Sequence, residues 1–265
     1  MSIITISRGS YSRGKEVAEK VASRLGYQCI SRDAVIEACS EYNVPEVKLI
    51  HAICDAPSIL ERFTGGKTRF LAYLQAALLE MLQEDNAVYH GLAGHFFVKN
   101  VPHVLKVRII AEMADRAKLE MERKGVSESE ALRILRSDDE ERRKWSRFNF
   151  GIDTWDSALY DLVIHINKLN SDEAADLICR TVELECFHTT PQSQQIMNNL
   201  TVAARVKAAL IDLKPEVEVS AADGNVRVQI KSSQVRDEWR IKKLAKAVAG
   251  VKQVEIKAQE ISLRP

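Results

Sequence analysis

The chain has 265 residues, of which 46% are apolar and 28% charged, and 38 Lys and Arg against 37 Asp and Glu leave a formal net charge of +1. This composition is typical of a soluble globular protein and excludes a collagen-like, disordered or disulfide-framework chain. The five cysteines are scattered without a C-x-x-C pair, and no window approaches the roughly 18 uninterrupted apolar residues of a membrane span, so the expected compartment is the cytoplasm.

Short apolar runs alternate with long amphipathic stretches over the first 185 residues. This alternation is typical of βα units around a parallel sheet, and it predicts an α/β domain with five strands. The expected strands are Ile3–Ile6, Tyr27–Ile30, Ala87–His90, Val104–Ile110 and Leu162–Ile166. The expected helices are Lys15–Leu25, Asp33–Tyr42, Arg69–Glu84, Arg116–Lys124, Glu128 to about Arg147, and Asp172 to about Glu185.

The composition changes after residue 186, where a polar, amide-rich run with one proline predicts a linker over residues 187–198. Beyond it the pattern predicts a small αββαβ unit over residues 199–265, separate from the domain of residues 1–186. Its expected elements are a helix at Thr201–Leu213, strands at Val217–Ser220 and Val226–Ile230, a helix at Val235–Ala249 and a strand at Val251–Ile256.

This tail is mildly basic, with 13 Lys and Arg against 8 Asp and Glu from residue 201 onward, a balance of 13 − 8 = +5. Lys242, Lys243 and Lys246 are candidates for contact with phosphate groups of lipid or nucleic acid. The alternative is an ordinary solvated helix face.

The strongest local motif joins the first strand to the first helix. Gly9 and Gly14 are five residues apart and Lys15 follows, which fits G-x-x-x-x-G-K between a strand and a helix. Backbone N–H groups of such a loop converge on phosphate oxygens, and the lysine reaches the outer phosphates as a point charge. The motif therefore predicts a phosphate loop, with a polar βα turn as the alternative.

The loop departs from the usual pattern in two ways. The hydroxyl residue that would ligate magnesium is replaced by Glu16, and Tyr11 and Arg13 stand where more permissive residues are easier to accommodate. A second G-K-T run ends at Thr68, but it follows a helical pattern and is interpreted as a hinge.

Charged residues are dense between Arg133 and Arg147. A helical hairpin with this pattern could close over a polyanion as an arginine lid, because phosphoryl transfer is promoted by positioned positive charge. A salt-bridged helix facing solvent explains the same spacing equally well.

Several short motifs together resemble the cytidylate kinase-like family over about residues 1–185. They are Ile6-Ser7-Arg8 before the loop, Gly14-Lys15-Glu16 within it, the D-x-x-R pair of Asp139 and Arg142, and Tyr160-Asp161-Leu162 at the start of the last strand. The resemblance implies a P-loop nucleoside monophosphate kinase fold with a five-stranded parallel sheet, an acceptor-binding helical insertion and an arginine lid. One departure is Leu92 after Gly91, where the family often has an arginine.

The resemblance also implies roles for individual residues. ATP phosphates are expected at Arg8, Gly9, Ser10, Tyr11, Ser12, Arg13, Gly14, Lys15 and Glu16. The expected catalytic residues are Lys15, Arg142 and Arg147, and the expected substrate-binding residues are Asp33, Arg116 and Asp139. Mg²⁺ is expected to be held mainly by the nucleotide and water, with no metal ligands from the protein.

The tail resembles a BON domain through Asp223-Gly224-Asn225-Val226 and through the run from Val248 to Val254. This likeness implies a module that binds phospholipid or another ligand and adds no catalytic residue.

The leading hypothesis is ATP-dependent phosphoryl transfer to CMP, dCMP or a related small acceptor. One alternative is a nucleotide-binding sensor that has lost turnover and signals through the tail, so enzyme status is left open. A third is an adaptor that binds membrane surfaces or nucleic acid through the tail. The expected partner is a nucleotide substrate. Under the leading hypothesis no nucleic-acid partner is expected. The sequence does not decide between a monomer and a homodimer.

Overall fold

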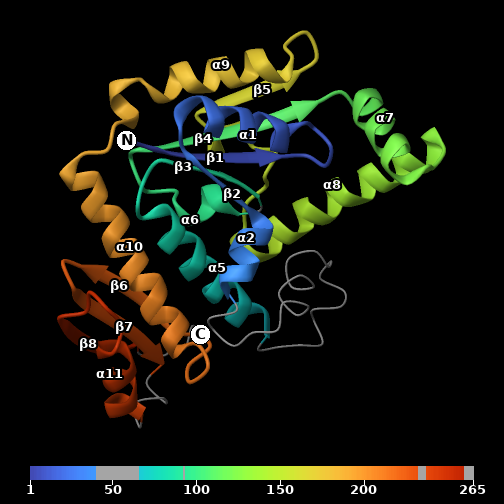
Figure 1. Cartoon of the computed structure of the whole chain (residues 1–265). Helices are drawn as coiled ribbons and strands as arrows, with labels where there is room; N and C mark the ends of the chain where they lie inside the picture. Colours follow the sequence, from blue (N-terminus) through green and yellow to red (C-terminus); the bar gives the residue numbers. More distant parts are fainter. Residues whose placement is uncertain (40–65, 92, 232–236, 260–265) are drawn as a thin grey trace.

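The computed structural model describes residues 1–39, 66–91, 93–231 and 237–259. Its N-terminal unit is built on a five-stranded sheet with the strand order β2-β3-β1-β4-β5, in which all neighbours run parallel (Figure 1). The strands are β1 (Ile3–Arg8), β2 (Gln28–Ser31), β3 (Ala87–His90), β4 (Val104–Ala111) and β5 (Leu162–Ile166). The predicted five-stranded parallel sheet is confirmed.

Helices cover both faces of this sheet. Successive strand residues point to opposite faces, so Ile3 packs into the core beside α5 while Ile4 and Ile6 pack into the core beside α1 and α9. The helices of this unit are α1 (Gly14–Leu25), α2 (Arg32–Ala38), α5 (Gly66–Leu82), α6 (Gly94–Phe97), α7 (Met113–Lys124), α8 (Glu128–Phe150) and α9 (Ser171–Val182), with short 3₁₀ turns at Ser157–Leu159 and Glu185–Phe187.

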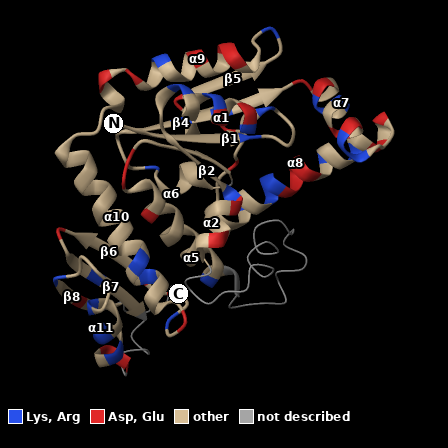
Figure 2. Cartoon of the chain, viewed as in Figure 1, with Lys and Arg blue, Asp and Glu red and all other residues tan. Residues whose placement is uncertain are grey.

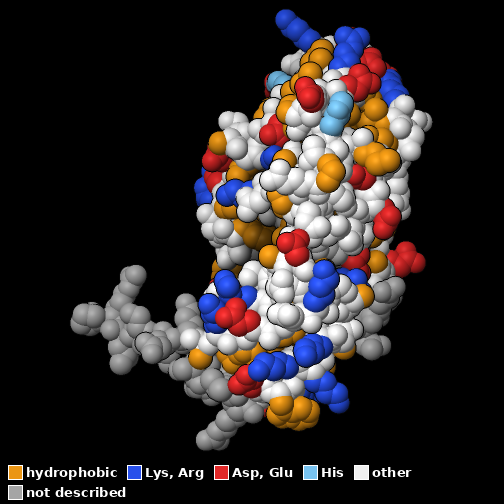
Figure 3. All heavy atoms as spheres, turned by 90° about the vertical axis from the view of Figure 1, so that its left-hand side faces the viewer, with side chains coloured by type: hydrophobic (Ala, Val, Ile, Leu, Met, Phe, Trp, Pro, Cys, Tyr) orange, Lys and Arg blue, Asp and Glu red, His pale blue; other side chains and the backbone are white. Residues whose placement is uncertain are grey.

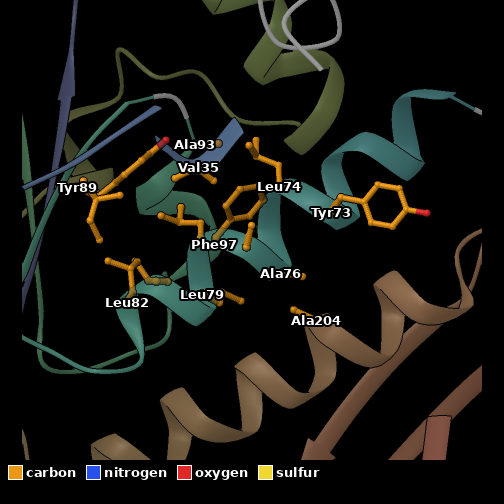
Figure 4. Packing of buried hydrophobic residues seen from close by; sticks show 14 of the residues in the cluster. Val35, Tyr73, Leu74, Ala76, Leu79, Leu82, Tyr89, Ala93, Phe97 and Ala204 are labelled. Carbon is orange, nitrogen blue, oxygen red and sulfur yellow. The ribbon is translucent and has the colours of Figure 1, made fainter. Parts of the chain in front are cut away.

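The predicted linker differs from the structure, because residues 191–198 form about two turns at the start of α10 (Pro191–Leu210). Thr190 caps this helix by accepting from the backbone N–H of Ser193, and Pro191 occupies the first helical position. The amide-rich stretch nevertheless has a packed residue, because Met197 is fully buried in the same core as residues of α5. Farther along α10, Ala204 lies beside Ala76 and Leu79 of α5 (Figure 4). The two units are therefore joined by a helix that is part of the first unit's core.

The C-terminal unit has the predicted αββαβ order, with α10 followed by β6 (Glu218–Ala222), β7 (Asn225–Lys231), α11 (Glu238–Lys246) and β8 (Gln253–Gln259). β7 pairs antiparallel with β6 and parallel with β8. Val206, Val228 and Ile241 belong to its separate core. The likeness of this unit to a BON domain stays a prediction. No helix within the described ranges combines the length and the apolar character needed to cross a membrane.

Candidate active site

Residues 9–13 connect β1 to α1, as predicted, and we call them, together with Gly14 and Lys15 at the start of α1, the β1–α1 loop. Ser12 is buried, and its hydroxyl lies 3.0 Å from the carbonyl oxygen of Gly9 and 3.2 Å from that of Ile109 in β4. α1 begins at Gly14. Because the first N–H groups of a helix have no intrahelical partner, the loop and this helix end together form a region of positive potential.

Two non-glycine residues of the loop have left-handed backbones, Tyr11 at φ 56° and Arg13 at φ 62°. Such angles cost about 1–3 kcal/mol each and persist where the surroundings hold them. Tyr11 is held by the small core between α7 and α8, and its ring lies 5.1 Å from the Arg123 guanidinium. Burial, together with the neighbouring carboxylate of Glu120, raises the pKa of Tyr11. The loop is thus anchored to the α7–α8 hairpin.

Gly14 lies against the side chain of Arg8, and a Cβ at Gly14 would be 2.7 Å from Arg8 Cβ and Cδ. We expect Gly14→Ala to lower the free energy of unfolding by about 1–3 kcal/mol, because the loop and β1 must move apart. The matched control is Gly9→Ala, whose Cβ would meet the Arg116 guanidinium at an ordinary 3.5 Å. Urea unfolding of both variants tests this, and equal stabilities would contradict it.

A cavity of about 500 Å³ lies beside the loop, and we call it the central cavity. It brings together cations from four segments of the chain and acids from two. Its lining residues are Arg8, Ser10, Tyr11, Lys15, Ser31, Arg32, Asp33, His90, Gly91, Asp138, Glu141, Arg142 and Trp145. The size falls in the range of small-ligand sites, about 300–1,000 Å³.

The electrostatics of the central cavity favour an anion. Burial, and then repulsion from Arg142 and Arg32, lower the pKa of Arg8. The buried Nε of Arg8 has no hydrogen-bond partner among the described residues. An anionic oxygen placed between these arginines would satisfy that donor and relieve the repulsion.

Lys15 reaches the central cavity from the first turn of α1. Its side chain is 64% exposed and lies 3.6 Å from Glu19, a loose ion pair. Glu16 pairs with Arg13 at 3.4 Å and Lys20 at 3.6 Å on the helix surface. The position that would supply a magnesium-binding hydroxyl is therefore occupied by a carboxylate engaged with two cations.

Arg116 and Asp139, both predicted to bind substrate, form a bidentate ion pair with two N–O distances of 2.8 Å, in which Arg116 is buried and Asp139 is mostly buried. Arg116 also donates from Nε to the carbonyl oxygen of Ser10 at 2.7 Å. This arginine therefore connects the β1–α1 loop to α8. Their substrate-binding role stays a prediction.

The charged residues of α8 divide between the central cavity and the exposed surface, and Figure 2 shows both signs of charge along this helix. Arg142 lines the central cavity, whereas Arg133 pairs with Glu130 at 2.6 Å on the exposed surface. Arg147, predicted to be catalytic, pairs instead with Asp153 at 2.7 Å. Hydrogen bonds, first from Arg143 and also from Arg147, keep the pKa of Asp153 well below its usual range. A role for Arg147 at the reacting phosphate would require it to leave this pair, and it stays a prediction.

Sequence reasoning missed Arg32, His90, Asp138 and Glu141 as cavity residues. Arg32 and His90 carried an available signal, since each lies at the carboxyl end of a parallel strand, where binding sites of open α/β sheets are built. Leu92 and Gly65 lie outside the described residues. Gly66–Thr68, interpreted from the sequence as part of a hinge, are the first residues of α5.

A buried histidine beside the central cavity is expected to make the stability of the fold depend on pH. His95 Nε2 lies 3.4 Å from the hydroxyl of Tyr160, which donates to the carbonyl oxygen of Thr154 at 3.0 Å. Burial, with the charges of Arg108 and Lys106, lowers the pKa of His95 to about 3. The folded protein therefore holds this imidazole neutral.

We expect this histidine to destabilise the fold in acid. Its pKa falls from 6.5 in the unfolded chain to about 3 in the folded one, so the unfolded state binds the proton better and stability is lost as the pH falls from 6.5 toward 3. The loss at pH 5 is about 2 kcal/mol. Urea unfolding at pH 7.5 and 5 should show a smaller drop for His95→Gln than for the parent; equal drops would exclude this origin.

The residues fit a polyphosphate better than a metal held by the protein. Within the described ranges, no group of three or more His, Cys, Asp or Glu side chains has the geometry to hold a metal ion. The orphaned Arg8 Nε and the helix end offer donors for phosphate oxygens instead.

Comparison with known proteins decides the family. The model of the cytidylate kinase-like family matches residues 3–168, most of the chain. The chain belongs to the cytidylate kinase-like family. Cytidylate kinase of Archaeoglobus fulgidus is 27% identical over 69% of this chain and 95% of its own length. Cytidylate kinase of Ignicoccus hospitalis is 26% identical over 68% of this chain and 98% of its own length.

Solved structures agree on the fold. An uncharacterized protein from Eubacterium ventriosum superposes with a TM-score of 0.54 at 23% identity, over 69% of this chain and 98% of its own. The family match lies within the N-terminal unit, and the C-terminal unit lies outside it.

Proposed function

We propose that this protein transfers the terminal phosphoryl group of ATP to a nucleoside monophosphate, with CMP or dCMP as the expected acceptor. The observation that carries the proposal is the central cavity, where Arg8, Arg32 and Arg142 face one another beside the β1–α1 loop. Membership of the cytidylate kinase-like family supports it, as do the relatives described as cytidylate kinases.

In this proposal the N–H groups and cations bind phosphates, and the acidic residues bind the rest of the acceptor nucleotide. The loop N–H groups and Lys15 would bind the phosphates of ATP, and the arginines would hold the acceptor phosphate and the charge that develops during transfer. Asp33, Asp138 and Glu141 accept hydrogen bonds, which suits the amino and hydroxyl groups of a cytidine nucleotide. Magnesium would shield phosphate charge when bound with the nucleotide, and its ligands would come from phosphate and water.

An assay coupled to ADP release, run with CMP, dCMP, UMP, AMP and GMP as acceptors, tests this function. Turnover with a cytidine monophosphate and little with the purine acceptors is expected. The absence of turnover with every acceptor would overturn the proposal.

The second candidate is a nucleotide-binding sensor. The left-handed backbones of Tyr11 and Arg13 in the β1–α1 loop favour it, because loops in which the backbone approaches a phosphate closely usually have glycine at such positions. Calorimetry with ATP beside the coupled assay separates the two: tight binding without any turnover supports the sensor, and turnover rejects it.

A further inference from the structure

A second cavity, of about 390 Å³, lies where the two units meet, and we call it the junction cavity. It is formed by the end of α5, one face of α10, the β6–β7 turn and the turn before β8. Its lining residues are Gln83, Gln195, Asn198, Asn199, Thr201, Val202, Arg205, Asp223, Gly224, Ala249, Gly250 and Lys252. None of them lines the central cavity.

The walls of the junction cavity are held in place. Arg205 of α10 pairs with Glu80 of α5 at 2.8 Å, and Gln83 Nε2 donates to Asn198 Oδ1 at 2.9 Å. On the other side, a Cβ at Gly224 would lie 2.9 Å from the carbonyl oxygen of Gly250, so the two turns are in close contact. The cavity is therefore bounded by fixed elements of both units.

The amides of the junction cavity leave donors for a ligand. Asn198 Oδ1 accepts from Gln83 and Gln194, and Asn199 Oδ1 accepts from Gln195 and from the backbone N–H of Asp223. Both oxygens are thus occupied, while the Nδ2 groups have no acceptor among the described residues. An amide of this kind offers N–H donors to an oxygen-rich ligand.

The charged residues of the junction cavity also favour an oxygen-rich, anionic ligand. Lys252 forms no ion pair within the described ranges, and Arg205 uses its Nε for Glu80, which leaves the other guanidinium donors of the fork. Asp223 supplies one carboxylate that can accept from a hydroxyl group. Figure 3 shows several Lys and Arg side chains, with some Asp and Glu, over the lower half of the face that it draws, where the C-terminal unit lies.

We propose that the junction cavity binds a small phosphate monoester that also carries hydroxyl groups, either a nucleotide or a sugar phosphate. Lys252 and Arg205 would hold the phosphate, the asparagine amides would donate to its oxygens, and Asp223 would accept from a hydroxyl group. The volume suits a ligand of this size. Bound there, the ligand would contact α5, α10 and both turns of the C-terminal unit.

Isothermal titration of the full chain with ribose 5-phosphate, CMP and inorganic phosphate, at low ionic strength, tests this site. We expect Lys252→Glu to weaken one ester-binding event at least tenfold. Lys252→Gln, which keeps the packing of the side-chain stem on Gly224, should weaken it less. Lys246→Glu makes the same charge change on exposed α11 and should leave binding unchanged.

The ester that responds identifies the source of the ligand, ribose 5-phosphate for a sugar phosphate and CMP for a nucleotide. Equal binding of both esters by the parent and by Lys252→Glu would overturn the proposal, as would binding of inorganic phosphate as tight as that of the esters. Lys252→Glu should retain the phosphoryl transfer rate of the parent. Because calorimetry does not require turnover, the site is tested even if the proposed kinase activity fails.

Discussion

Lys15→Met is expected to lower kcat/KM for phosphoryl transfer by about 10²–10³-fold, the usual effect of losing one group that stabilises transition-state charge. The Lys15 ammonium is the cation placed at the end of the β1–α1 loop, where it lines the central cavity. The fold should not change, because the side chain is 64% exposed and only loosely paired with Glu19. The free energy of unfolding is expected to stay within about 0.5 kcal/mol of the parent.

Coupled-assay kinetics and urea unfolding of the same preparation measure both quantities. Lys118→Met is a suitable control, since Lys118 is a 73% exposed lysine of α7 outside the central cavity. Turnover of Lys15→Met within threefold of the parent would show that the lysine does not contact the transferred phosphate.

Asp139→Asn is expected to cost about 3–5 kcal/mol of unfolding free energy, the effect of leaving one partner of a buried ion pair uncompensated. Asp139 and Arg116 are 13% and 8% exposed and are joined by two short contacts. The same change should also loosen the loop, because Arg116 holds the carbonyl oxygen of Ser10. Affinity for ATP is therefore expected to fall together with stability.

Chemical unfolding compared with Glu130→Gln measures this effect. That control breaks an ion pair on the same helix, but on its exposed surface, where such pairs contribute at most about 1 kcal/mol. If the two variants were equally stable, the buried pair would have no special structural role.

Sequence periodicity predicts well those elements whose signals lie within the element itself, such as a contiguous apolar run or a helix cap. The five strands are short runs in the predicted places, and α9 begins at Ser171 after its cap Asn170, which forms a complete capping box with Glu173. The start of α10 was missed because its amide-rich residues have no strong apolar period. Its buried face is created by contact with α5, which the sequence does not display.

The candidate site was predictable in part for the same reason. The β1–α1 loop is contiguous, so its glycines and lysine could be read directly from the chain. Arg32, Asp138 and Arg142 come together only through the strand order and the path of α8. For Arg147 the sequence predicted a catalytic role, but the structure pairs its guanidinium with Asp153, a contact that residue spacing alone does not predict.

Tyr11 belongs both to the β1–α1 loop and to the small core between α7 and α8. A displacement of the hairpin must therefore withdraw this ring from its packing or carry the loop along with it. If the proposed phosphoryl transfer requires this hairpin to move, the packing of one aromatic side chain contributes to the free-energy cost of each turnover.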